Sequence, residues 1–169
     1  YTLDPHQSVI KVPRDFEIDD IDWNPVAAIM VETCAYGPYM EPPTQEFWNK
    51  LNKIRDDYDV LIIIDDIFMG AGKTGNYIGW KEFDFTPDIS TMGKAMTGGF
   101  FPLSMTLYNQ KIKDTLPKEF FWQHGFTYSF SLPGIASATK YLEILERDNL
   151  LARRSEEHTS ELQSQCLIS

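Results

Sequence analysis

The sequence lacks several features that would point to particular classes of protein. No run of 18 or more apolar residues occurs along its 169 residues, so no part of it predicts a membrane-spanning helix. The two cysteines, Cys34 and Cys166, are too few for a disulfide framework or a cysteine-rich metal cluster. The chain opens on Tyr1 with no signal-peptide pattern, and because Tyr1 is not a methionine we expect the true start to be missing. These absences favour a reducing compartment, and we expect a cytoplasmic protein that has no membrane partner.

A positive net charge is also lacking. The chain carries 15 Lys and Arg against 25 Asp and Glu, which gives a formal charge of -10. Such a chain repels the phosphate backbone of nucleic acids, so we expect no nucleic-acid partner. Hydrophobic residues make up 43% and aromatic residues 14% of the sequence, which is typical of a globular chain with a packed core.

Residues 154–169 differ in character from the rest of the chain. The stretch turns abruptly polar after Arg153 and has neither a helical stripe nor a strand pattern. It can be encoded by a string that resembles a common sequencing adapter read in frame. We therefore interpret 154–169 as an artefactual tail, the alternative being a disordered polar tail, and base the fold prediction on residues 1–153. In this interpretation His158 and Cys166 have no functional role.

Short apolar runs alternate with helical patterns along residues 1–153. Residues 60–64 form an apolar run too short for a helix, and Thr44 is placed to cap a helix. Alternating strands and helices predict an α/β fold with a mostly parallel sheet. The expected strands are 26–31, 60–64, 87–92 and 103–108, and the expected helices are 45–57, a short one after Asn109, and 133–151. The expected buried face of the first helix consists of Phe47, Leu51, Ile54 and Tyr58.

Two charged residues follow strands of this predicted sheet. Asp65 comes directly after the run 60–64, and Lys94 follows the run 87–92 after one glycine. In open α/β sheets ligands bind beyond the carboxyl ends of the strands, so we expect Asp65 and Lys94 to share a site. Ile67 would lie on the same face as Asp65 if the chain stays extended. Taken singly, an aspartate at a strand end is often a turn residue, and a lysine is usually a solvated surface charge.

Three segments together resemble the class III aminotransferases, a family of pyridoxal-phosphate (PLP) enzymes. The segment VLIIIDDIFMGAGKTG at 60–75 is similar to an apolar run of that family with two acids and a Gly-rich loop. The segment PDISTMGKAMTGGFFPLS at 87–104 is similar to the family's cofactor-lysine segment, and HGFTY at 124–128 to a later one. The resemblance extends over 26–153. It implies the α/β large domain of a fold type I PLP transferase, a mostly parallel sheet with flanking helices, of which residues 1–153 are a part that lacks both ends.

The resemblance implies a role for each matched residue. Lys94 matches the lysine that holds PLP as a Schiff base and moves protons, and Asp65 matches the carboxylate that pairs with the pyridine nitrogen. Ile67 matches the side chain that packs on the ring face, and Thr127 matches the hydroxyl that binds the cofactor phosphate from the neighbouring subunit. Glu32 matches an acidic residue after a core strand, and its role is expected to be structural. The family implies a homodimer that transfers an amino group from an amine or amino acid, ω-amino donors included, to a 2-oxo acid or aldehyde.

Several positions depart from the family pattern. Phe68 stands where many members have a glutamine that can contact the ring oxygen of the cofactor, and Ala71 and Lys73 replace the more usual Phe and Arg. Ser131 and Leu132 stand near the usual Gly-Asn pair. These differences bear on subfamily and substrate more than on reaction class. The phosphate cup and the carboxylate-binding arginine of the family would lie outside this chain, so no residue is assigned to them.

Three other interpretations remain open. The sequence GAGKT at 70–74 looks like the phosphate-binding P-loop of an NTPase, but that pattern requires a glycine where this chain has Ile67. A PLP-dependent aminomutase of the same fold would share the lysine segment and would need no oxo-acid acceptor. A non-catalytic homologue is disfavoured because both Lys94 and Asp65 are present.

The histidines do not predict a metal site. No cluster of His, Cys or carboxylate residues has the spacing of metal ligands. We interpret His6 as a packing or capping residue, and His124, which precedes Gly125, as a residue that positions its loop.

Overall fold

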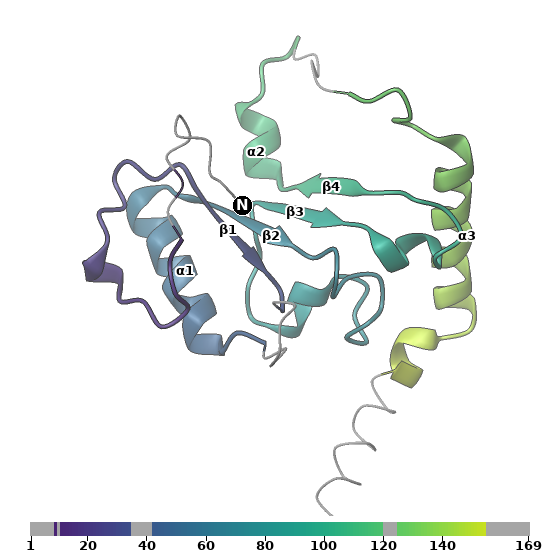
Figure 1. The fold of residues 1–169 in the computed structure, drawn as a ribbon, viewed down its shortest axis with the longest axis horizontal. Coiled ribbons are helices and arrows are strands. Elements are labelled where there is room, and N and C mark those ends of the chain that lie inside the picture. The colour runs from purple at the N-terminus through teal and green to yellow at the C-terminus, as the bar shows by residue number, and fades with distance from the viewer. Residues whose placement is uncertain (1–8, 10, 35–41, 120–124, 155–169) are drawn as a thin grey trace, which may run out of the picture.

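A four-stranded sheet in the order β1-β2-β3-β4 forms the centre of the molecule (Figure 1). This computed structural model describes residues 9, 11–34, 42–119 and 125–154. The first three strands are parallel, whereas the fourth runs antiparallel to the third. The prediction of a mostly parallel sheet is therefore confirmed. The strands are β1 Ala28–Glu32, β2 Leu61–Asp65, β3 Ile89–Met92 and β4 Met105–Tyr108.

The strands begin one or two residues later than the apolar runs predicted. At β3 the cause is Asp88, which the sequence assigned to the strand. Its carboxylate accepts a hydrogen bond from the Ile62 N–H at 2.8 Å, and its own N–H donates to the Ile62 carbonyl at 3.0 Å. The residue therefore ties the start of β3 to β2 through its side chain as well as its backbone. At the other end of β2, Asp65 belongs to the strand.

Apart from a short helical stretch at 150–154, three α-helices and three short 3-10 helices complete the described elements. They are α1 Gln45–Tyr58, α2 Gln110–Thr115, α3 Leu132–Arg147, η1 Ile18–Asp20, η2 Gly79–Glu82 and η3 Lys94–Thr97. Thr44 caps α1, because its hydroxyl oxygen accepts from the Phe47 N–H at 3.2 Å. Asn109 caps α2 in the same way, accepting from the Ile112 N–H at 3.0 Å. Both caps agree with the sequence prediction, whereas the 3-10 helices were not predicted.

The helix α3 ends before its predicted boundary at residue 151. Asn149 adopts a φ of 50°, in the left-handed region, which interrupts the helical path. The Asp148 N–H still donates to the Ile144 carbonyl at 3.0 Å, so the last turn is closed. A polar residue that tolerates the left-handed region thus sets the end of the helix.

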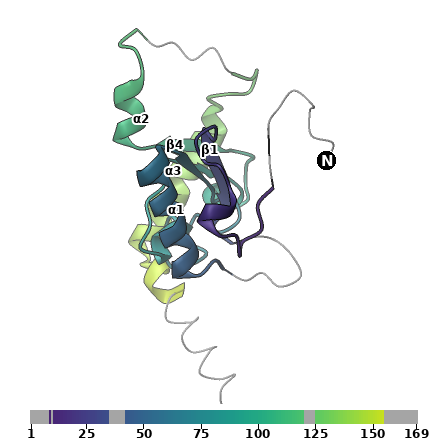
Figure 2. The ribbon, with the colours of Figure 1, turned by 90° about the vertical axis from the view of Figure 1, so that its left-hand side faces the viewer.

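The helices α1 and α3 lie on the same side of the sheet (Figures 1 and 2). On that side Ile62 and Ile64 of β2 are fully buried, whereas Ile63 between them is only half-buried. Met30 pairs with Ile63 across β1 and β2 and is 63% exposed. Within the described residues, the face that carries Met30 and Ile63 is therefore covered by no helix, and we call it the open face.

Two hydrophobic clusters fill the covered side, and they correct one prediction. Trp48 of α1 is fully buried, and its ring lies 4.8 Å from that of Phe85, centre to centre. Leu51 and Ile54 are buried as predicted, but Tyr58 is 38% exposed. The predicted helix face is therefore rotated, because the largest side chain of α1 takes the central place in the core. The buried members of the larger cluster are Phe16, Trp23, Trp48, Leu51, Ile54, Val60, Ile62, Ile64 and Phe85, and those of the smaller are Ala71, Met92, Met96 and Ala138.

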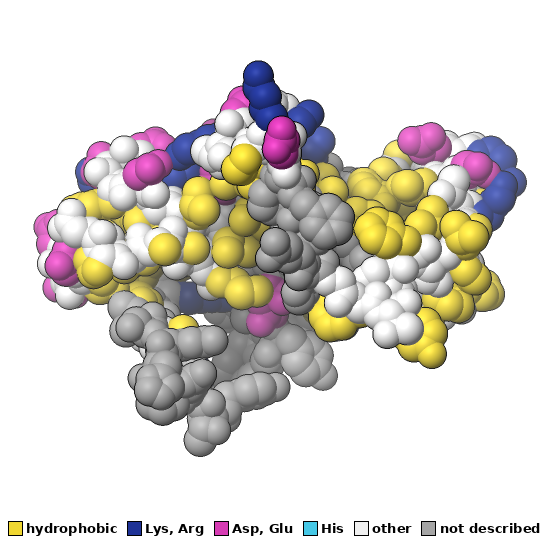
Figure 3. Space-filling model, turned by 90° about the horizontal axis from the view of Figure 1, so that it is seen from above, with side chains coloured by type: hydrophobic (Ala, Val, Ile, Leu, Met, Phe, Trp, Pro, Cys, Tyr) yellow, Lys and Arg dark blue, Asp and Glu magenta, His cyan; other side chains and the backbone are white. Residues whose placement is uncertain are grey.

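Hydrophobic side chains gather on the surface over the end of the molecule where α3 begins (Figure 3). Their exposed fractions lie between 74% and 89%, which is unusual for large apolar side chains. Contiguous exposed apolar surface marks sites of interaction with other protein. We call this patch the apolar end; it consists of Phe126, Tyr128, Phe130 and Leu132.

Among the described residues, no helix is long and apolar enough to cross a membrane. The same residues contain no group of three His, Cys, Asp or Glu side chains that could hold a metal ion. Cys34 is buried. Outside the described residues lie His6, His124, His158, Cys166 and all of the predicted tail except Arg154.

Candidate active site

Lys94 occupies an unusual backbone position. It follows β3 and Gly93 and begins η3 with a φ of 46°, in the left-handed region that L-residues rarely adopt. Such a conformation costs on the order of 1–3 kcal/mol and persists where the surroundings impose it. The residues after it are anchored, because Met96 and Thr97 are buried and the Ser137 hydroxyl of α3 donates to the Thr97 carbonyl at 3.0 Å. The lysine itself is exposed at the carboxyl end of β3.

Asp65 lies at the same edge, on the neighbouring strand. It is the last residue of β2 and pairs with Thr91 of β3 and with Glu32 of β1. Paired residues of adjacent strands point to the same side of a sheet, so all three belong to the open face. Lys94 follows three residues after Thr91. The structure therefore brings Asp65 and Lys94 to one edge of the sheet, as predicted.

Thr91 is a candidate that the sequence did not reveal. Its hydroxyl oxygen is buried and has no hydrogen-bond partner within the described ranges of the chain. A buried hydroxyl without a hydrogen-bond partner destabilises the folded protein by about 1–3 kcal/mol, so such a group normally has a partner in a complete site. Only the strand register, which pairs it with Asp65, could have identified it.

Ile67 reaches this edge by a different route from the one predicted. The chain does not stay extended after Asp65, because the Asp65 carboxylate accepts a hydrogen bond from the Ile67 N–H at 3.0 Å and starts a turn. The extended-strand argument for Ile67 is therefore wrong. Its side chain nevertheless lies beside Gly93, since a Cβ placed on that glycine would be 3.5 Å from Ile67 Cγ2.

The aromatic ring of Phe68 lies near two lysines. The Lys94 ammonium lies 5.1 Å from the centre of the Phe68 ring, and the Lys73 ammonium lies 3.4 Å from it. Both distances allow a cation–π interaction. Burial lowers the pKa of Lys73 below its ordinary value, and the nearby charge of Lys94 lowers it further. The sequence identified Phe68 and Lys73 only as departures from a pattern, and not as neighbours of Lys94.

Thr127 is not brought to the edge that carries Asp65 and Lys94. It is exposed, in a turn at 127–130 that leads into α3 (Figure 1). The turn is closed on itself, because the Phe126 N–H donates to the Ser129 hydroxyl at 3.0 Å. Its position on the surface beside the apolar end leaves the side chain accessible to another molecule.

Asp66 is a second acid that sequence reasoning did not identify. It is fully buried, and its carboxylate accepts hydrogen bonds from the Thr33 hydroxyl at 2.6 Å and from the Gly79 N–H at 2.8 Å. Burial raises its pKa above the ordinary value of an aspartate, which the two hydrogen bonds partly offset. Asp65 and Asp66 therefore point to opposite sides of β2 and have different surroundings.

The Gly-rich loop does not have the geometry of a P-loop. Residues 67–74 form successive turns, and the described chain has no α-helix between β2 and β4. A P-loop requires a helix directly after the glycines, because the helix N-terminus binds the phosphate. Instead the Ala71 N–H donates to the Tyr77 carbonyl at 2.8 Å, and the Tyr141 hydroxyl of α3 donates to the Ala71 carbonyl at 2.7 Å.

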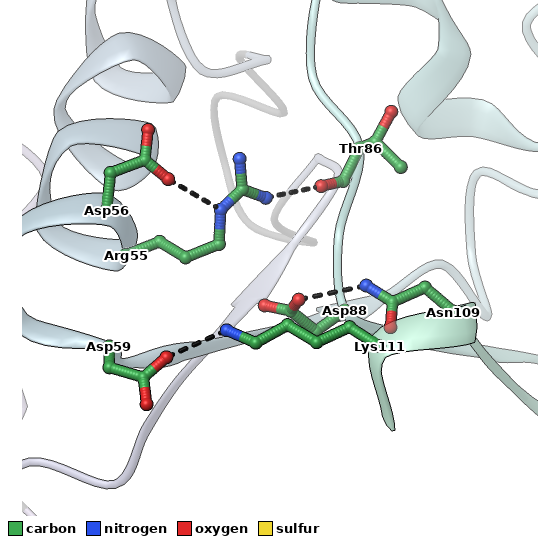
Figure 4. Close-up of a pocket in the computed structure, with 7 residues that line it drawn as sticks. All are labelled: Arg55, Asp56, Asp59, Thr86, Asp88, Asn109 and Lys111. Carbon is green, nitrogen blue, oxygen red and sulfur yellow. Dashed lines mark hydrogen bonds and ion pairs between the residues drawn. The ribbon is translucent and has the colours of Figure 1, made fainter. Parts of the chain in front are cut away.

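An open cavity of about 470 Å³ lies at the opposite edge of the sheet (Figure 4). Its polar side chains interact with one another. The Lys111 ammonium forms an ion pair with the Asp59 carboxylate at 2.7 Å, and the Asn109 amide donates a hydrogen bond to the Asp88 carboxylate at 2.9 Å. The cavity adjoins the amino ends of β2 and β3, whereas ligands of parallel sheets bind beyond the carboxyl ends. It is therefore separate from the site around Lys94.

The mostly parallel sheet with its helices defines the class as an α/β domain, and solved structures of transaminases share this fold. One is the ω-transaminase of Thermomicrobium roseum, described as (S)-enantioselective, with 30% identity and a TM-score of 0.71 over 79% of this chain and 30% of that one. Another is an aminotransferase from Bacillus anthracis, with 25% identity and a TM-score of 0.75 over 89% of this chain and 37% of that one.

Sequence relatives extend this result. The chain is 31% identical to a taurine–pyruvate aminotransferase of Bilophila wadsworthia, over 75% of this chain and 29% of the relative. It is 30% identical to a β-alanine–pyruvate aminotransferase of Pseudomonas aeruginosa, over 80% of this chain and 32% of the relative. The family model "Aminotransferase class-III" matches residues 6–167. The chain belongs to the class III aminotransferase family, whose members depend on PLP, and it spans about a third of the length of the curated relatives it matches.

Proposed function

We propose that the protein containing this chain is a PLP-dependent transaminase. It moves an amino group from an amine or amino acid, ω-amino donors included, to a 2-oxo acid or aldehyde. The observation that carries the proposal is the position of Asp65 at the end of β2 and of Lys94 just past the end of the adjacent strand β3, at the same edge of the sheet. The names of the relatives support it, since two of them pair an amino compound with pyruvate.

The residues at this edge fit the cofactor chemically. PLP requires an amine that binds it covalently, a carboxylate beside its ring nitrogen and an apolar side chain on its ring face. Lys94, Asp65 and Ile67 supply these groups. The buried hydroxyl of Thr91, which lacks a partner in the described chain, adds a polar group on the face where such a ring would lie.

Each residue then has a defined task. When bound, PLP supplies a carbonyl that takes up the amino group and a ring that spreads the electrons of the breaking bond. The Lys94 amine holds the cofactor and, when released by the amino donor, carries a proton to and from the reacting carbon. Asp65 keeps a proton on the ring nitrogen through a charge-assisted hydrogen bond. Ile67 excludes water from one side of the ring.

A homodimer with shared active sites belongs to the same proposal. Thr127 would bind the cofactor phosphate of the neighbouring subunit, which agrees with its exposed position outside the edge of its own Asp65 and Lys94. The apolar end next to it offers surface for a second copy of the protein. We also propose that the protein is cytoplasmic, because its low cysteine content fits a reducing compartment.

The test uses the complete gene product, purified with PLP. Borohydride reduction followed by peptide mass analysis should find a pyridoxyl group on Lys94. An unmodified Lys94 in a folded, PLP-saturated protein would refute the proposal and favour a non-catalytic homologue. The aminomutase alternative is tested by product analysis without an added oxo-acid acceptor. An aminomutase turns over repeatedly under this condition, whereas a transaminase stops after the first half-reaction, because nothing takes up the amino group it has removed from the donor.

A further inference from the structure

The carboxylate of Asp66 joins two segments that are far apart in the sequence. Thr33 lies just past the end of β1, and Gly79 begins η2. Both donate to the same buried carboxylate, at 2.6 Å and 2.8 Å. Hydrogen bonds to a charged or strongly polar buried group are among the stronger ones in a protein. The far end of the loop 67–79 is thereby held against the end of β1.

The backbone of Asp66 holds the near end of the same loop. Its N–H donates to the Thr91 carbonyl of β3 at 2.9 Å, and its carbonyl accepts from the Gly70 N–H at 2.8 Å. Glycine is required at both contacts, because a Cβ on Gly70 would lie 2.9 Å from Asp66 Oδ2 and one on Gly79 would lie 2.6 Å from Oδ1. One residue thus connects both ends of the loop with the ends of two neighbouring strands.

The loop that Asp66 holds carries side chains to Lys94. Ile67 packs beside Gly93, the residue before the lysine, and the Phe68 ring faces the lysine ammonium at 5.1 Å. A shift of the loop would therefore move both side chains relative to Lys94. Positions held within about 0.5 Å distinguish an effective site from a loose one.

We propose that Asp66, with Thr33, is a positioning residue of this active site. It contacts neither the cofactor nor the substrate and acts through the loop 67–79, which places Ile67 and Phe68 against the cofactor held by Lys94. The inference rests on the proposed function, since it assumes that Lys94 binds PLP. The inference gives Asp66, the second of the two adjacent acids, a role in the site.

Asp88 provides a matched control for the effect of stability alone. It is 2% exposed and, like Asp66, accepts two hydrogen bonds from neutral donors, the Ile62 N–H at 2.8 Å and the Asn109 amide at 2.9 Å. It lies at the opposite edge of the same sheet, away from Lys94. Removing either carboxylate should lower the melting temperature, but only Asp66 should affect the bound cofactor.

The experiment compares variants of the complete PLP-loaded protein. Asp66→Ala should raise the rate of PLP dissociation about tenfold and weaken the visible circular dichroism of the bound cofactor, because two buried donors lose their acceptor. Asp66→Asn should keep both signals near those of the parent, since its amide can accept from Gly79 and donate to the Thr33 hydroxyl. Asp88→Ala should leave both signals unchanged while it lowers the melting temperature.

Thr33 gives an independent and milder pair of variants, which serves if Asp66→Ala does not fold. Thr33→Val should weaken the cofactor signals and Thr33→Ser should restore them. Equal cofactor signals in Asp66→Ala and Asp88→Ala, or in Thr33→Val and Thr33→Ser, would overturn the inference. If borohydride labels Lys94 in the parent, such a result removes only the positioning role; an unlabelled Lys94 in the parent removes both this role and the proposed function.

Discussion

Asp65 and Thr91 are direct neighbours across the parallel strands β2 and β3, and both belong to the face of the sheet that no described helix covers. One offers a carboxylate, and the other a buried hydroxyl that lacks a partner in the described chain. Lys94 follows at the end of the same strand as Thr91. Asp65, Thr91 and Lys94 make up the centre of the proposed site, and the first two predictions concern Lys94 and Thr91.

Substitution of the lysine should remove catalysis and leave the fold intact. Because Lys94 is exposed, Lys94→Ala should change stability little, whereas kcat should fall by about 10²- to 10⁴-fold with the loss of the proton-transferring amine. Steady-state kinetics and a thermal melt on the complete protein measure both quantities. Lys53→Ala, at an exposed lysine of α1, is the control and should match the parent. Retention of kcat in Lys94→Ala would show that another group performs the step.

The Thr91 hydroxyl should contribute to cofactor binding. If the complete site satisfies this group, Thr91→Val should weaken PLP affinity about tenfold, the value of one buried hydrogen bond. Thr91→Ser keeps the hydroxyl and should bind PLP as the parent does. Fluorescence titration of the apoprotein with PLP measures the dissociation constants. Equal affinities of the valine and serine variants would show that the hydroxyl has no role at the site.

The buried carboxyl of Asp66 should make stability depend on pH in an unusual direction. Its pKa is raised above 3.8, chiefly by burial and also by the neighbouring charge of Asp65. As pH rises from about 3.8 through the raised pKa, the unfolded chain has released this proton while the folded chain still holds it, so the folded state loses stability. Above the raised pKa of Asp66, this loss of stability no longer changes with pH.

Comparison with Asp66→Asn isolates this contribution, because all other titrating groups are common to both proteins. The free energy of unfolding of the parent relative to the variant should fall across the window and then stay level. Urea unfolding at a series of pH values measures it. A difference that is constant from acid to neutral pH would mean that the proton on Asp66 is bound equally in both states.

Residues 1–153 expressed alone should fold poorly. Met30 is 63% exposed on the open face and Phe130 is 89% exposed on the apolar end, so the isolated piece presents large apolar surfaces to water. We expect no cooperative thermal transition by circular dichroism and aggregation at micromolar concentration. A cooperative melt of this piece would show that the described core is sufficient for stability.

Much of the local structure was readable from residue types. The β-branched run at 60–64 predicted β2, and Thr44 and Asn109 predicted the starts of α1 and α2, because caps and periodicity act over a few residues. The motifs also identified the family, and with it Asp65 and Lys94 as the pair to examine. The failures were of a different kind. Ile67 was placed by an extended-strand argument, but the Asp65 carboxylate turns the chain, and Trp48 displaced Tyr58 from the core face of α1.

Features that depend on spacing along the chain could thus be recognised without a structure: the lysine segment that resembles the family's, the strand-end acid and the α/β alternation. Which acid faces the site and which is buried, whether the hydroxyl of Thr91 has a partner, and the left-handed backbone of Lys94 were decided by the packed fold. The reason is physical. Strand register, burial and backbone strain arise from contacts between residues tens of positions apart, such as Thr33 with Asp66, and no local pattern contains them.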